Sequence, residues 1–152
     1  MSTLVSTKGR YALRAMADIA QNQGDGLIPL AEVAQRQGIS EKYLESIVTT
    51  LSKAGFIVGQ RGKGGGYRLA FEPREYSIGS ILRLVEGSLV PVACLGFEES
   101  RQCSYKHVCR TLPLWEELGG LINGFLDSKT LQDVIDQGAG MPEGIAFCGD
   151  FD

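Results

Sequence analysis

The sequence of 152 residues lacks features that several protein classes require. No apolar run approaches the roughly 20 residues that a membrane-spanning helix needs. A secretory signal has an uninterrupted apolar stretch near the N-terminus, but here Lys8, Arg10, Arg14 and Asp18 interrupt it. We therefore expect a cytoplasmic protein that does not associate with membranes.

Histidine is also scarce, because His107 is the single histidine in the sequence. The sequence shows no nucleophile motif and no paired carboxylates that could support acid–base chemistry, so we predict that the protein is not an enzyme. The chain does contain four cysteines. Disulfides are rare in a reducing compartment, which favours metal binding or redox chemistry for these thiols.

Charge is divided unevenly along the chain, although the net charge is only −3. Residues 1–74 carry ten Lys or Arg and six Asp or Glu, whereas residues 75–152 carry five and twelve. A basic first half suggests that this half binds a polyanion such as nucleic acid. A chance division of charge in a short chain would look the same.

The first half is organised as helices separated by glycines. Apolar periodicity predicts helices over residues 8–22, 30–37 and 40–54, with Ser40 capping the third. A glycine-containing turn at residues 38–39 joins the second and third of these. This pattern is typical of a helix-turn-helix, although many plain helical pairs share it.

The next stretch predicts a β-hairpin. Residues 56–61 and 67–70 have strand character and flank the run Gly62-Lys63-Gly64-Gly65-Gly66. A phosphate-binding P-loop would need Lys and Ser or Thr where Gly65 and Gly66 stand, and it would open a helix. A helix-turn-helix followed by such a hairpin is a winged helix. We therefore interpret the run as a wing tip that approaches DNA closely, with Arg61 and Lys63 supplying charge.

The second half predicts a further helix over residues 77–87, an irregular segment over 88–106, and a long apolar helix from about residue 107 or 109 to 126. The wide apolar face of that helix favours packing against another subunit, although it could pack on its own domain. Residues 129–136 could add one or two helical turns. We divide the chain into a DNA-binding domain (1–90), a cysteine loop (91–108), a dimerisation region (109–136) and a flexible tail (137–152).

The irregular segment contains Cys94, Cys103 and Cys109, with His107 among them. Thiolates suit iron–sulfur clusters or zinc. Structural zinc sites usually show a short Cys-x-x-Cys element, which is absent here, so the wide spacing favours a cluster. Isolated reduced cysteines remain an alternative on spacing alone, and Cys148 lies far off in the tail.

These motifs together resemble the IscR-type winged-helix regulators of the Rrf2 family. The resemblance covers nearly everything up to residue 135. It rests on STKGRYALRAMADIA (6–20), ISEKYLESIVTTLSKAGFIVGQRGKGGGYRLA (39–70), the three-cysteine loop (94–109) and LWEELGGLINGFLDSKTLQDVI (114–135).

The resemblance implies a mainly α protein with a small β-hairpin wing and a long dimerisation helix. It implies a homodimer that binds double-stranded operator DNA and holds a [2Fe–2S] cluster on the three cysteines. Glu45 matches the position whose side chain lets such regulators distinguish one class of operator sequence from another. The DNA-contacting residues that it implies are Lys8, Ser40, Tyr43, Glu45, Arg61, Gly62, Lys63, Gly64, Gly65 and Gly66.

The fourth cluster ligand departs from the family pattern. IscR-type proteins carry a histidine three residues after the third cysteine, where this sequence has Leu112. Nitric-oxide-sensing relatives use an N-terminal aspartate of the partner subunit, and in this sequence Arg10 stands at that position. His107, an acidic residue or Cys148 could each fill the role, and we place His107 first. A cluster-free repressor controlled by thiols or a partner, and a small iron–sulfur carrier, are the alternative functions.

Overall fold

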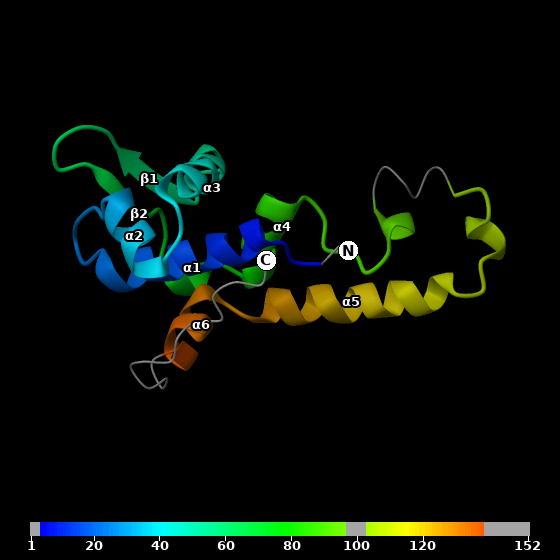
Figure 1. Ribbon diagram of the computed structural model, residues 1–152. Coiled ribbons are helices and arrows are strands. Elements are labelled where there is room, and N and C mark those ends of the chain that lie inside the picture. The colour runs from blue at the N-terminus through cyan, green and yellow to red at the C-terminus, as the bar shows by residue number, and fades with distance from the viewer. Residues whose placement is uncertain (1–3, 97–102, 139–152) are drawn as a thin grey trace.

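The computed structural model describes residues 4–96 and 103–138 (Figure 1). Two antiparallel strands, β1 (Ile57–Gln60) and β2 (Gly66–Leu69), form a hairpin. Short 3₁₀ helices lie at Pro73–Glu75 (η1), Ala93–Leu95 (η2) and Lys106–Val108 (η4). The α-helices are α1 (Thr7–Asn22), α2 (Leu30–Gln37), α3 (Glu41–Lys53), α4 (Ile78–Glu86), α5 (Leu112–Ser128) and α6 (Leu131–Gly138). The predicted mainly α architecture with one hairpin is confirmed.

Helix α1 lies at the centre of the winged-helix part of the molecule, and α2, α3, α4, α6 and β2 pack around it. Its apolar stripe is fully buried and includes Ala12, Ala15, Met16 and Ile19. Burying a side chain such as Ile19 stabilises the fold by about 1.5–3 kcal/mol. The surrounding elements are therefore fixed relative to one another through α1.

The predicted apolar stripe of α3 is confirmed, because Leu44, Ile47, Val48 and Leu51 are all buried. The predicted cap is also confirmed: the Ser40 hydroxyl accepts a hydrogen bond from the Tyr43 amide at 3.2 Å. Such a cap satisfies one of the free amides in the first turn and contributes about 1 kcal/mol. The start of α3 is thus held firmly.

The long helix begins later than predicted. It starts at Leu112, and the residues around His107 instead form the separate turn η4. Pro113 explains the difference, because its ring lacks an N–H and would clash with the carbonyl four residues earlier in a continuous helix. At the other end of this region, α6 extends to Gly138, two residues into the predicted tail. The rest of that tail, with Cys148, lies outside the described residues.

Helix α5 extends away from the winged-helix part, and α6 returns to pack beneath α1 (Figure 1). Backbone hydrogen bonds fix this return: the Ile78 amide donates to the Lys129 carbonyl at 2.8 Å, and the Leu131 amide donates to the Tyr76 carbonyl at 3.0 Å. Within the described ranges, no helix combines the length and apolar character needed to cross a membrane.

Candidate nucleic-acid interface and cysteine loop

Helix α3 presents a polar face to solvent. Ser40, Tyr43 and Glu45 are exposed, and the buried stripe lies on the opposite face. Gly38 makes the turn before α3 possible, because its φ of 64° is a left-handed conformation that disfavours a side chain. All three residues predicted to read DNA from α3 are therefore accessible to solvent.

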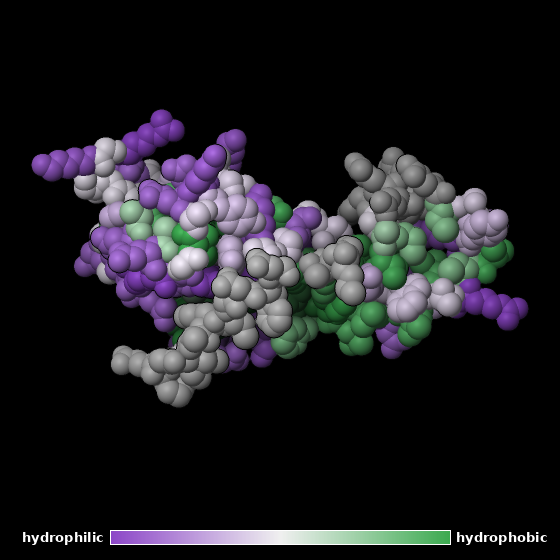
Figure 2. Space-filling model, viewed as in Figure 1, coloured by the Kyte–Doolittle hydropathy of each residue, from purple (hydrophilic) through white to green (hydrophobic). Residues whose placement is uncertain are grey.

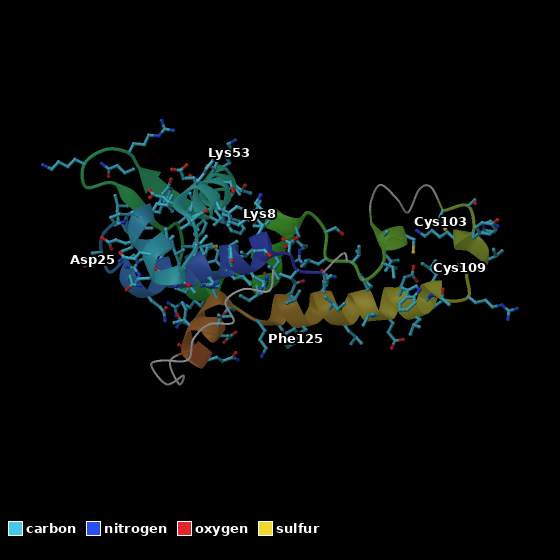
Figure 3. The ribbon with its side chains drawn as sticks, in the orientation of Figure 1. Lys8, Asp25, Lys53, Cys103, Cys109 and Phe125 are labelled. Carbon is cyan, nitrogen blue, oxygen red and sulfur yellow. The ribbon has the colours of Figure 1, made fainter. Side chains whose placement is uncertain are left out.

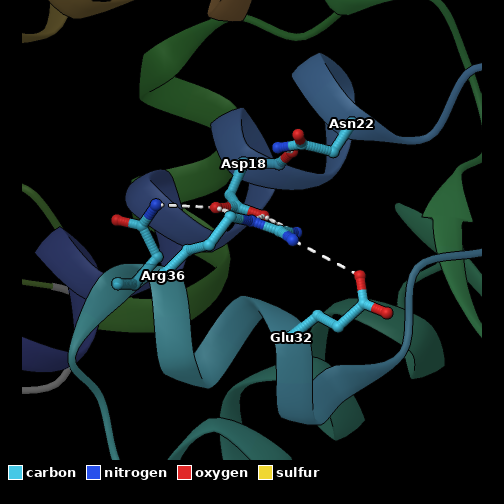
Figure 4. A network of polar contacts seen from close by, with 5 residues as sticks. Asp18, Asn22, Glu32 and Arg36 are labelled. Atoms are coloured by element: carbon cyan, nitrogen blue, oxygen red, sulfur yellow. Dashed lines mark hydrogen bonds and ion pairs between the residues drawn. The ribbon is translucent and has the colours of Figure 1, made fainter.

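A buried carboxylate holds the helix-turn-helix against α1 (Figure 4). Asp18 is only 3% exposed, and both of its oxygens accept hydrogen bonds from Arg36. The Gln37 amide donates to the same carboxylate at 2.8 Å. Hydrogen bonding to Asp18 raises the pKa of Arg36 above its ordinary value. Local sequence patterns do not predict this network, because its two sides lie on separate helices.

The wing is more than a two-stranded hairpin. Ile28, in the segment before α2, exchanges two backbone hydrogen bonds of 2.8 Å with Tyr67 of β2. Strand β2 therefore has partners on both sides. Arg61 and Lys63 lie in the exposed tip between the strands. Figure 2 shows hydrophilic residues gathered over this part of the molecule.

The glycines of the wing tip have structural reasons of their own. Gly64 has a φ of 77°, in open space where nothing else excludes a side chain. At Gly66 a side chain would clash with the backbone of Ile28, which the strand approaches closely. Gly62 and Gly65 belong to the same turn, where the Gly65 amide donates to the Gly62 carbonyl at 3.0 Å. The glycine run is therefore required by the hairpin, and close approach to DNA stays a prediction.

Lys8 lies half-buried in the first turn of α1, on the side of the molecule that also carries Lys53 of α3 (Figure 3). This turn is capped twice. The Ser6 hydroxyl accepts from the Gly9 amide, and the Glu86 carboxylate at the end of α4 accepts from the Ser6 amide at 2.8 Å and the Ser6 hydroxyl at 2.7 Å. The position of Lys8 is consequently tied to α4.

The cysteines lie at the far end of the molecule from the wing, where Cys103 and Cys109 stand beside the start of α5 (Figure 3). Cys94, Cys103 and Cys109 are free thiols and half-buried, and His107 is exposed in η4. A hydrogen bond with the Thr111 hydroxyl lowers the pKa of Cys109. Among the residues described, no three His, Cys, Asp or Glu side chains converge as a metal site. The structure therefore does not bring the predicted ligands together.

The cysteine loop is joined to the winged-helix part through α5. Pro91 and Leu95 of the loop segment pack against α5 at Gly119. One turn later, the Asn123 amide donates to the carbonyls of Leu89 and Gly119, each at 2.9 Å. The Arg83 guanidinium of α4 donates to the Asn123 oxygen at 2.9 Å. Asn123 thus ties α5 both to α4 and to Leu89, in the segment that leads into the cysteine loop.

Comparison with known proteins identifies the fold and its role. Residues 5–137 match the model of the Rrf2 family, described as an iron-dependent transcriptional regulator. The chain belongs to the Rrf2 family. It is 40% identical over 131 residues to the HTH-type transcriptional regulator IscR of Aliivibrio salmonicida, covering 86% of this chain and 76% of that protein. This Rrf2 protein is therefore an IscR-like, DNA-binding transcriptional regulator, and its curated relatives are regulators rather than enzymes.

Solved structures give the same assignment. The Rrf2 chain superposes on T. potens IscR with a TM-score of 0.68 and 40% identity, covering 92% of this chain and 93% of that one. It also superposes on CymR, the global cysteine regulator of B. subtilis, with a TM-score of 0.71 and 36% identity, covering 90% and 98%. The predicted family and winged-helix fold are confirmed.

Proposed function

We propose that the protein is a homodimeric repressor or activator whose affinity for operator DNA responds to a [2Fe–2S] cluster on Cys94, Cys103 and Cys109. The observation that carries the DNA-binding part is the exposed polar face of α3, which lies next to a wing with two exposed cations. Helix α3 would enter the major groove, and the wing would follow the adjacent backbone.

The contacts divide into two kinds. Ser40, Tyr43 and Glu45 would read base edges, with the Glu45 carboxylate accepting a hydrogen bond from a cytosine amino group. Arg61, Lys63 and Lys8 would contact phosphates, and such contacts make affinity fall as salt rises. R61A should therefore weaken binding to all sequences and reduce the salt slope by about 1. An unchanged salt slope would show that Arg61 does not contact the phosphates.

The apolar face of α5 supports a dimer. Leu114, Leu121 and Phe125 are 56%, 66% and 61% exposed, and Figure 2 shows hydrophobic residues gathered along this helix. An apolar face of this extent on a single chain marks a protein–protein interface. L121E should produce monomers in sedimentation experiments. V58E, which makes the same change at an exposed apolar site on β1, should leave the dimer intact.

The cysteine loop fits a cluster by the chemistry of its donors. It supplies three free thiols, and the hydroxyl of Thr111 favours the thiolate form of Cys109. When bound, a cluster supplies a centre that responds to iron supply, oxidants or nitric oxide. Because metal binding orders its own ligands, convergence of the thiols would accompany cluster insertion. His107 is our first choice as fourth ligand, with an acidic residue or Cys148 as alternatives.

A second candidate is a repressor without a cluster that senses through its thiols. The similarity to CymR favours it, together with the separation of the three cysteines in the structure. A third, a small iron–sulfur carrier, would need the cysteines but not the wing. R61A would leave the activity of such a carrier intact.

Anaerobic purification distinguishes these functions. The cluster proposal predicts a coloured protein with iron and sulfide, and C94A should lose both. H107A should alter the spectrum if His107 is a ligand. A protein that stays colourless after reconstitution, yet binds promoter DNA in a salt-sensitive manner, would refute the cluster and support the thiol-sensing function.

A further inference from the structure

Tyr43 of the recognition helix rests on an aromatic ring of α1. The rings of Tyr11 and Tyr43 pack edge to face, with centroids 5.8 Å apart and planes at 80°. Tyr43 nevertheless keeps 37% of its surface exposed, so part of it is available to a ligand while another part is held. Aromatic pairs of this geometry contribute more than the area they bury, because the positive edge of one ring meets the negative face of the other.

Tyr11 is itself held in place by Arg14, one turn further along α1. The Arg14 guanidinium lies 5.3 Å from the centre of the Tyr11 ring. The same guanidinium donates to the Gln37 side chain at 3.1 Å and to the Gln37 carbonyl. Gln37 in turn donates to the buried Asp18. One continuous set of contacts therefore joins the turn before α3 to the ring under Tyr43.

We infer that Tyr11 is a positioning residue: it lies on α1, not on the recognition helix, and it sets how Tyr43 meets a base in the major groove. The inference rests on the proposed base-reading role of Tyr43. Ser40 caps the first turn of α3 through the Tyr43 amide, so the backbone at this point is fixed. The side chain then depends on its neighbour for orientation, and Tyr11 is the aromatic residue in contact with it.

This role differs from a purely structural one in what it changes. Loss of a core residue would weaken binding to every DNA sequence through loss of folded protein. Loss of a positioning residue would weaken binding to the preferred sequence and leave phosphate contacts in place, because these come from Arg61, Lys63 and Lys8. The readout is therefore the ratio of affinities for a specific and a non-specific duplex, measured together with the salt slope.

The experiment uses the full chain and two DNA duplexes. The first is the duplex that the wild-type protein enriches from a random-sequence pool, and the second is a scrambled duplex of equal composition. Y11L and Y43A should each lower the specificity ratio. For Y11L, loss of the aromatic contact should lower the specificity ratio by between about 2-fold and 12-fold. Y11F keeps the ring and should retain the ratio. F71L removes the ring of another edge-to-face pair, Phe71–Tyr76, outside the proposed DNA contacts and the cysteine loop, and serves as the matched control.

The double variant adds a sharper test. If Tyr11 acts through Tyr43, the Y11L change should cause little further loss in a Y43A background. If Y43A lowers the specificity ratio and Y11L leaves it at the wild-type value, the role of Tyr11 is overturned and that of Tyr43 stands. A wild-type ratio for Y43A would overturn the base-reading role of Tyr43, and the role of Tyr11 with it. An equal fall in affinity for both duplexes with Y11L would show a structural role and also overturn the inference.

Discussion

Replacing Gly66 by alanine tests whether the glycine run serves the hairpin itself. A side chain at Gly66 would meet the backbone of Ile28, which cannot move aside as a flexible side chain could. The substitution should therefore separate Ile28 from β2. That separation breaks the two hydrogen bonds between Ile28 and Tyr67, each of 2.8 Å.

The size of the effect follows from these contacts. Each of the two hydrogen bonds contributes about 1 kcal/mol net, so their loss costs about 2 kcal/mol. The positive φ of 156° adds backbone strain, of about 1 kcal/mol. At Gly64, by contrast, nothing lies within 4 Å of an added side chain. There only the left-handed backbone opposes alanine, at about 1 kcal/mol.

Urea denaturation at a fixed protein concentration would measure both free energies of unfolding. G66A should be less stable than G64A by about 2 kcal/mol, the sum above less the single strain term that both variants share. Hydrogen exchange of the Tyr67 amide should also accelerate in G66A. Equal stability of the two variants would refute the argument. A G66A protein with wild-type stability and lost DNA affinity would instead assign this glycine to close approach of DNA.

Three further predictions concern the contacts that position the DNA-binding half. D18A should lower the free energy of unfolding by about 2 kcal/mol rather than the 3–5 kcal/mol typical of a broken buried pair, because Arg36 is 36% exposed and can regain water. N123A removes donors to two backbone carbonyls and should lower it by about 1–2 kcal/mol, measured by the same titration. The Thr130 backbone amide lowers the pKa of Asp133 below its ordinary 3.8. Ionised Asp133 therefore stabilises the folded state. This contribution is complete above pH 3.8, the pKa in the unfolded chain, and is lost as the pH falls through the lower pKa of the folded state. D133N should remove this part of the acid transition, and identical acid transitions would contradict it.

Local patterns were enough to predict the DNA-binding helices. The second helix has the predicted bounds, and Ser40 caps the third as expected, because caps and apolar stripes depend on residues a few positions apart. The wing was also predicted, although each strand differs by one or two residues. The bridge from Ile28 was missed, since a single residue carries no strand pattern and its partner lies in the hairpin.

Long-range contacts account for the rest. In the sequence, Asp18 looks like an ordinary polar residue of a helix. Its burial depends on Arg36, which lies on another helix. The sequence predicts the glycine run as a hairpin tip that approaches DNA, but it does not reveal the steric need for Gly66, because the approach of β2 to Ile28 exists only in the folded chain. Helix α5 begins later than its apolar pattern predicts, although Pro113 marks the boundary in the sequence. For the cysteines, spacing indicated a shared role but not the geometry, and the structure describes them as separate thiols.

The most direct test of the central claim is the affinity of the anaerobically purified protein for its selected duplex, measured by fluorescence anisotropy before and after the cluster is removed. If the cluster controls binding, the intact protein should carry about two irons and two sulfides per chain, and its affinity for this duplex should change when they are lost. The same affinity with and without the cluster, in a protein that still binds the duplex specifically, would contradict regulation through the cysteine loop.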